Sequence, residues 1–104
     1  MTGFTDRETA FENKFAHDEE LKFKAEARRN KLVGLWAAEL LGKTGDAAAA
    51  YAKEVISADI EEHGEEDVFR KLSADLGTRA DAATIRAKMA TLMDEAKRQI
   101  MDQQ

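Results

Sequence analysis

The chain of 104 residues carries 16 Lys and Arg against 21 Asp and Glu, a formal net charge of −5 at pH 7. This length fits one small domain, and the acidic total argues against a general nucleic-acid-binding protein. Because the chain holds no Cys, disulfide scaffolds, thiolate metal sites and cysteine nucleophiles are excluded. No apolar run approaches the ~20 residues of a membrane span, and the N-terminus lacks the apolar region of a signal peptide. We therefore expect a cytoplasmic protein.

An all-α fold is predicted by the lack of Pro, the charged fraction of 36% and the helical spacing of the apolar residues. The first predicted helix begins at a capping box formed by Thr5 and Glu8 and runs to Leu41, where Gly42 ends it. A helix of about 36 residues would be roughly 54 Å long. Its apolar stripe is interrupted at residues 17–20 and then resumes at Leu21, Ala25, Arg28, Leu32, Leu35 and Trp36.

Three shorter helices are predicted to follow. Asp46 is expected to cap the second and Gly64 to end it, Gly77 to end the third, and Asp81 to cap the fourth. Their apolar stripes are Tyr51, Val55, Ile56 and Ile60; then Val68, Phe69, Leu72 and Leu76; then Ile85, Met89, Leu92, Met93, Ala96 and Ile100. Such short connections favour antiparallel neighbours, so the sequence predicts a four-helix bundle.

The long first helix cannot be covered by the three shorter ones. We therefore expect residues 1–18 to project as an arm, frayed or disordered when free, and residues 19–104 to form the bundle. Phe4, Phe11 and Phe15 would share one face of this arm. Two interpretations stay open: the Phe side chains fold back and extend the core, or the arm binds a partner's groove. A membrane-surface helix is disfavoured, since residues 1–20 hold six acids and two bases. The candidate partner-binding residues are Phe4, Asp6, Arg7, Glu8, Phe11, Glu12, Lys14 and Phe15.

A basic stretch follows the arm. Residues 22–31 hold five bases and one acid, and Lys24, Arg28 and Lys31 lie three or four residues apart on one helix face. Residues 54–67 hold seven acids and no Lys or Arg, so one interpretation is that the two segments pair. The alternatives are contact with a phosphate or nucleotide, or with a protein partner. The candidate nucleotide-binding residues are Lys22, Lys24, Arg28, Arg29 and Lys31.

The sequence predicts neither an enzyme nor a metal site. Ser57 and Ser73 have no neighbouring His–Asp arrangement, and the carboxylates lie on charged faces with no apolar surroundings to raise a pKa. His17 and His63 adjoin acidic residues, but two or three potential ligands on one exposed face are a weak metal signal.

Two blocks of the sequence resemble a known family. FENKFAHDEELKFKAEARRNKLVGLWAAELLG, from Phe11 to Gly42, and the following GDAAAAYAKEVISADIEEHGEEDVFRKL are similar to the zeta subunit of the α-proteobacterial ATP synthase. That subunit is a small inhibitor of ATP hydrolysis. The resemblance implies a four-helix bundle and an inhibitory arm at roughly Met1 to Asp18, which docks into the catalytic head of the enzyme. It also implies weak binding of ATP or ADP, which would suit the basic stretch.

The resemblance and the Phe arm together suggest a mechanism. The arm would fold into a helix in the cleft between catalytic and non-catalytic subunits, with its Phe face against that cleft and the central rotor, and would block rotary turnover. The protein is expected to be a monomer when free, without direct membrane insertion or nucleic-acid binding, and to lie at the inner face of the plasma membrane when bound.

Overall fold

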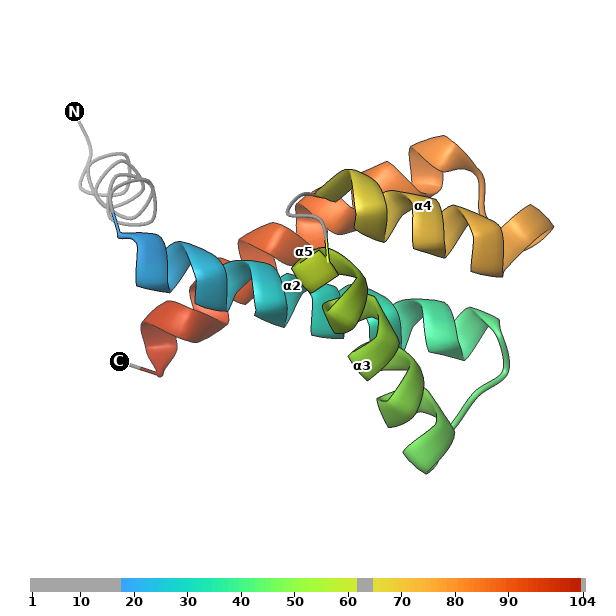
Figure 1. Ribbon diagram of the computed structural model, residues 1–104, viewed down its shortest axis with the longest axis horizontal. Helices are drawn as coiled ribbons and strands as arrows, with labels where there is room; N and C mark the ends of the chain where they lie inside the picture. The colour runs from blue at the N-terminus through green and yellow to red at the C-terminus, as the bar shows by residue number, and fades with distance from the viewer. Residues whose placement is uncertain (1–17, 62–64, 104) are drawn as a thin grey trace.

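The computed structural model describes residues 18–61 and 65–103, and every regular element in these ranges is a helix (Figure 1). The elements are α2 (Glu19–Leu40), α3 (Gly45–Glu61), α4 (Glu65–Leu76), the short 3₁₀ helix η1 (Gly77–Arg79) and α5 (Ala82–Asp102). The predicted all-α, four-helix fold is confirmed. The predicted start at Thr5, the projecting arm and the predicted stop at Gly64 lie outside the described residues.

Helix α2 begins at its own N-cap, so the prediction of one continuous helix from Thr5 to Leu41 is wrong. The backbone of Asp18 is extended, with φ −113° and ψ 103°, and its side chain accepts a hydrogen bond of 3.1 Å from the N–H of Leu21. Glu19 and Glu20 occupy the first turn, where carboxylates favour the positive end of the helix dipole. The residues that interrupt the apolar stripe therefore start a helix.

The glycine stops appear where they are predicted. Gly42 has φ +77°, and the N–H groups of Gly42 and Lys43 donate to the carbonyls of Glu39 and Ala38, which forms a Schellman motif. Gly77 has φ +56° directly after α4.

The two predicted aspartate caps differ in outcome. Asp81 caps α5 by accepting a 2.8 Å hydrogen bond from the N–H of Thr84. The prediction for Asp46 is wrong, because α3 already begins at Gly45 and Asp46 lies in its first turn.

Helix α2 is the central element and packs mainly on α3 and α5. Helix α4 lies at the end of the molecule that also holds α3 and the C-terminal half of α2 (Figure 1). The buried face of α2 differs from the predicted stripe: Leu35 is 37% exposed and Leu32 and Arg28 are half-buried, whereas Val33, Gly34, Ala37 and Ala38 are buried. A Cβ on Gly34 would lie 2.8 Å from the Cα of Ala52. Small residues therefore face α3, because only they permit this close approach of the two helices.

The core has two parts. The larger cluster contains ten buried residues from all four helices, and the smaller one contains only Leu21, Ala25 and Ile100, where the first turns of α2 meet the end of α5. The stripes predicted for α4 and α5 are confirmed at their buried positions, which are Val68, Leu72, Leu76, Ile85, Met89, Ala96 and Ile100. The larger cluster packs all four helices tightly, and the smaller one leaves part of α2 open.

Candidate functional site

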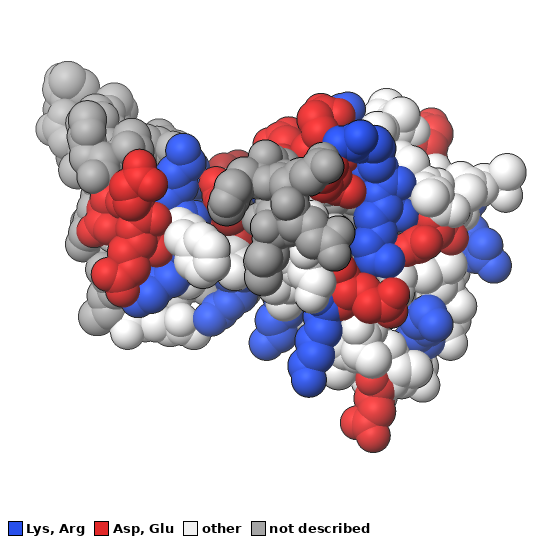
Figure 2. Space-filling view, viewed as in Figure 1, with Lys and Arg blue, Asp and Glu red and all other residues white. Residues whose placement is uncertain are grey.

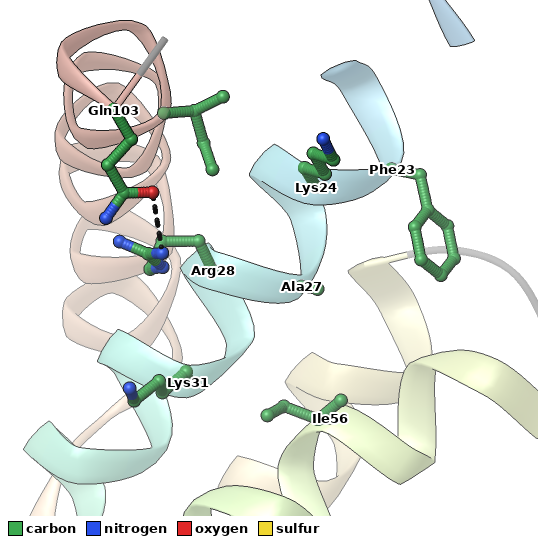
Figure 3. A pocket seen from close by; sticks show the side chains of 8 residues that line it. Phe23, Lys24, Ala27, Arg28, Lys31, Ile56 and Gln103 are labelled. Atoms are coloured by element: carbon green, nitrogen blue, oxygen red, sulfur yellow. Dashed lines mark hydrogen bonds between the residues drawn. The ribbon is translucent and has the colours of Figure 1, made fainter. Parts of the chain in front are cut away.

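A groove of about 560 Å³ lies along the exposed side of α2, between α3 and the last turns of α5 (Figure 3). The volume is within the usual range for small-molecule sites. Helix α2 contributes five of the lining residues, α3 contributes one, and α5 and its C-cap contribute one each: Phe23, Lys24, Ala27, Arg28 and Lys31; Ile56; Ile100; and Gln103. Three of the five candidate nucleotide-binding residues are thus brought together, with apolar side chains beside them.

Arg28 is the best-anchored cation of this groove. Its Nη1 donates to Gln99 Oε1 at 2.8 Å. Its Nη2 donates to Gln103 Oε1 at 3.1 Å (Figure 3). Both acceptors are neutral amides, so these hydrogen bonds orient the guanidinium without neutralising its charge. The predicted helix spacing places Arg28 at the groove, and α5 fixes it there.

The two lysines of the groove are exposed. Lys24 pairs with Glu20 one turn earlier, at 3.2 Å, and both side chains are more than half exposed, so the pair contributes little stability. No ion pair or side-chain hydrogen bond joins Lys31 to any described residue. Among the described residues, the two ammonium groups are therefore held by no more than one weak surface pair, that of Lys24 with Glu20.

The remaining two candidates, Lys22 and Arg29, do not line the groove. Lys22 is exposed, whereas Arg29 is only 3% exposed. Arg29 Nε donates to Asn30 Oδ1 at 2.9 Å, and its Nη1 lies 3.8 Å from Glu65. The Nδ2 of the fully buried Asn30 has no hydrogen-bond partner among the described residues. Arg29 thus belongs to the buried side of α2 and faces away from the groove.

The acidic segment, residues 54–67, forms its ion pairs mainly with cations outside the basic stretch of residues 22–31. Glu54 pairs with Lys71, Glu66 with Arg86 and Asp67 with Arg70, and only Arg29 of the basic stretch joins a described residue of this segment. Arg86 also lies 3.8 Å from the centre of the Phe69 ring. Figure 2 shows acidic and basic side chains interspersed on this face. Among the described residues, pairing between the two segments is therefore limited to Arg29, and Lys24, Arg28 and Lys31 lie at the groove.

A second polar cluster joins α3 to α4. Tyr51 donates to Asp75 Oδ2 at 2.8 Å, and Lys71 Nζ lies 3.0 Å from the same oxygen. Burial disfavours ionisation of Asp75, but the hydrogen bonds from Lys71 and Tyr51 outweigh it and lower the pKa of this carboxyl below its ordinary value. Burial, reinforced by Asp75, raises the pKa of Tyr51. The cluster holds α3 and α4 together.

Six residues of the groove region were not predicted as site residues: Phe23, Ala27, Ile56, Gln99, Ile100 and Gln103. Phe23 is 60% exposed. Its position in the sequence could have predicted its place in the groove. Phe23, Ala27 and Lys31 are spaced four residues apart and lie outside the predicted apolar stripe of this helix. Ile56, Gln99 and Gln103 come from distant segments, and only the packing of α3 and α5 on α2 reveals them.

The candidate arm residues Phe4, Asp6, Arg7, Glu8, Phe11, Glu12, Lys14 and Phe15 lie outside the described residues. None of the helices in the described ranges is both long and apolar enough to cross a membrane.

Comparison with known proteins identifies the family. The family model for ATPase inhibitor subunit zeta matches residues 1–99 of this chain, whereas no curated protein matches. Among solved structures, a solution NMR structure is 58% identical, with a TM-score of 0.74, and the match covers 81% of this chain and 99% of that chain. The resemblance seen in the sequence is confirmed: the chain belongs to the ATPase inhibitor subunit zeta family.

Proposed function

We propose that the chain has an inhibitory role at ATP synthase, regulatory rather than catalytic, which its membership of this family supports. We propose that the chain blocks ATP hydrolysis by inserting residues 1–18 as a helix between a catalytic and a non-catalytic subunit of the catalytic head. The observation that carries this proposal is the family match from residue 1 onward, because it includes the Phe-bearing segment before α2. The protein then acts at the inner face of the plasma membrane.

The energetics of insertion depend on three aromatic side chains. Burial of Phe4, Phe11 and Phe15 contributes roughly 1.5–3 kcal/mol each. Ordering of the segment on insertion opposes this gain. Polar contacts at the rim, from residues such as Glu8 and Lys14, therefore contribute to the net affinity. The bundle stays outside the cleft and limits how deeply the segment enters, with its inner end beside the central rotor.

The test measures ATP hydrolysis by purified ATP synthase in the presence of the full-length chain and two variants. In the first, Phe4, Phe11 and Phe15 are all replaced by Ala, and in the second only Phe23 is replaced. We expect the triple variant to lose inhibition and Phe23→Ala to keep it, because Phe23 lies on the bundle. Equal inhibition by all three proteins refutes the insertion mechanism, and no inhibition by any of them refutes the function.

A second function is favoured by the groove on α2. We propose that it binds ATP and ADP weakly, with the phosphates near Lys24, Arg28 and Lys31 and the base near Phe23. The supporting observation is the combination of three clustered cations with an exposed aromatic ring in a groove of about 560 Å³. Cations of this kind bind phosphate oxygens, and an aromatic face stacks on a nucleobase.

Titration with ATP, followed by amide chemical shifts, tests this second function. The groove residues are expected to shift at millimolar nucleotide, and Lys31→Gln is expected to weaken binding several-fold. Lys22→Gln is the matched control, since Lys22 is an exposed cation on the same helix that does not line the groove. Equal effects of the two substitutions would show that general charge, and not this groove, binds the nucleotide.

A further inference from the structure

The groove on α2 exposes apolar surface, and burial of this surface would be favourable. Phe23 is 60% exposed, and the neighbouring Ala27 and Ile56 are only half-buried. Along one edge of this apolar strip lie the exposed ammonium groups of Lys24 and Lys31. An occupant that fits must therefore bring apolar side chains to the strip and carboxylates to one side of it.

The N-terminal segment of the same chain has this chemistry. At helical spacing Phe4, Phe11 and Phe15 fall on one face, and Glu8 and Glu12 fall together on one flank of that face. Arg7 and Lys14 fall on the opposite flank. The segment thus matches the groove in both respects, with aromatic rings for the apolar strip and two adjacent carboxylates for the lysines.

The chain length also fits. Residue 17 adjoins the cap at Asp18, and Lys31 lies about 18 Å along α2 from Glu19 at 1.5 Å per residue. Seventeen residues span about 25 Å as a helix, and a turn between antiparallel helices takes about 2–5 residues. The segment therefore has enough length to turn back and reach the whole groove. Because it is tethered, its effective concentration is of millimolar order, so weak contacts suffice for docking.

We propose that residues 1–17 dock in the groove formed by Phe23, Lys24, Ala27, Lys31 and Ile56, and that this docked state competes with insertion into ATP synthase. The competition rests on the proposed function, and the docking itself does not. Both states bury the same Phe face, so a docked segment is unavailable to the enzyme. The fraction of undocked chains then scales the apparent inhibitory affinity.

A spin-label experiment on the full-length chain tests the docking. Since the chain has no Cys, Ala10→Cys introduces a single attachment site, which lies away from the Phe face at helical spacing. A nitroxide there is expected to broaden the amide signals of Phe23, Ala27 and Ile56 selectively. A label at Ala74→Cys, on the exposed side of α4, is the control and is expected to leave those signals sharp.

Charge reversal decides whether the contact is specific. Lys24→Glu combined with Lys31→Glu is expected to remove the selective broadening, and adding Glu8→Lys with Glu12→Lys is expected to restore it. Uniform broadening in the original chain, or broadening that ignores the reversal, overturns the proposal. So does broadening of an isotope-labelled chain by a spin label carried on a second copy, because the groove would then bind another molecule. Unchanged amide signals of α4 verify that the reversed variants remain folded.

Hydrolysis assays with the same variants separate the docking from the proposed function. If nine in ten segments are docked, the double Lys reversal lowers the half-inhibitory concentration about tenfold. An unchanged half-inhibitory concentration, together with selective broadening, overturns the competition. Selective broadening in a chain that never inhibits supports docking and refutes the inhibitory function. Inhibition without selective broadening refutes the docking and supports the inhibitory function.

Discussion

The two halves of α2 differ in how they are packed. The C-terminal half, around Val33 and Ala37, enters a cluster of ten buried residues drawn from four helices. The N-terminal half is held by Leu21 and Ala25 against Ile100, with Met93 and Met101 beside them. One helix therefore combines a tightly packed half, which fixes the fold, with a half that leaves the groove open.

This difference shows how a small domain divides two tasks. A chain of about 100 residues buries only about two-thirds of its surface, so it cannot cover every helix on all sides. Here the coverage is concentrated on the C-terminal half of α2, where Gly34 lets α3 approach closely. The exposed apolar surface of α2 lies along Phe23 and Ala27, where it can contact a ligand or a partner segment.

The largest loss of stability is expected for Leu72→Ala, in the larger cluster that also packs the C-terminal half of α2. Leu72 is fully buried, so the substitution removes apolar contacts and leaves a cavity, at a cost of about 2–5 kcal/mol. Ile100→Ala is the matched change in the smaller cluster and is expected to cost less, because Ile100 is 6% exposed and has fewer buried neighbours. Urea unfolding measures both. A greater loss at Ile100 would reverse the contrast between the two halves.

Gly34→Ala is expected to destabilise the chain by about 1–3 kcal/mol, the usual cost of overpacking. The added Cβ would lie 2.8 Å from the backbone Cα of Ala52, so α2 and α3 would have to separate. At an unpacked helix site the same change would stabilise by up to about 1 kcal/mol, because Ala favours the helix. The sign of the change in melting temperature therefore decides whether close packing at Gly34 holds the two helices.

Acidification is expected to weaken the junction between α3 and α4. The pKa of Asp75 is lowered in the folded chain, so its stabilising effect is present above the ordinary aspartate pKa of about 3.9 and is lost as pH falls through the lower folded value. Asp75→Asn is expected to make the free energy of unfolding less dependent on pH in that acidic range. Asp102→Asn, at the exposed end of α5, is the control. Equal pH profiles for the two variants would contradict the role of the Tyr51–Asp75–Lys71 cluster.

The smallest effect on stability is expected for Phe23→Ala. Because its side chain lies mostly in solvent, the free energy of unfolding should change by less than about 0.5 kcal/mol. This result would show that the exposed ring of Phe23 does not stabilise the fold. A loss above 1.5 kcal/mol, measured by the same urea unfolding, would instead make Phe23 part of the core.

The helix boundaries were largely predictable, because they depend on local chemistry. Gly42 and Gly77 adopt positive φ, and Asp81 accepts the expected hydrogen bond from the following turn. The interior of α2 was less predictable. A stripe chosen for large apolar side chains included Leu35, whereas the structure buries Gly34 and Ala38. Close helix contact selects small residues there, and a hydrophobicity pattern does not register them.

The candidate site was only partly predictable for a similar reason. Helical spacing correctly grouped Lys24, Arg28 and Lys31 on one face, but the same basic stretch contains Arg29, which is buried. The missing information is tertiary. Gln99 and Gln103, which orient Arg28, lie some 70 residues away in sequence. No local sequence pattern predicts that contact.

The cap at Asp18 has a consequence for protein engineering. Because α2 obtains its first-turn hydrogen bond from Asp18, its start requires no helical residue before position 18. The preceding segment can therefore be exchanged as a cassette between family members while the bundle keeps its own start signal. Chimaeras joined at this position would show whether the segment or the bundle determines the inhibitory potency.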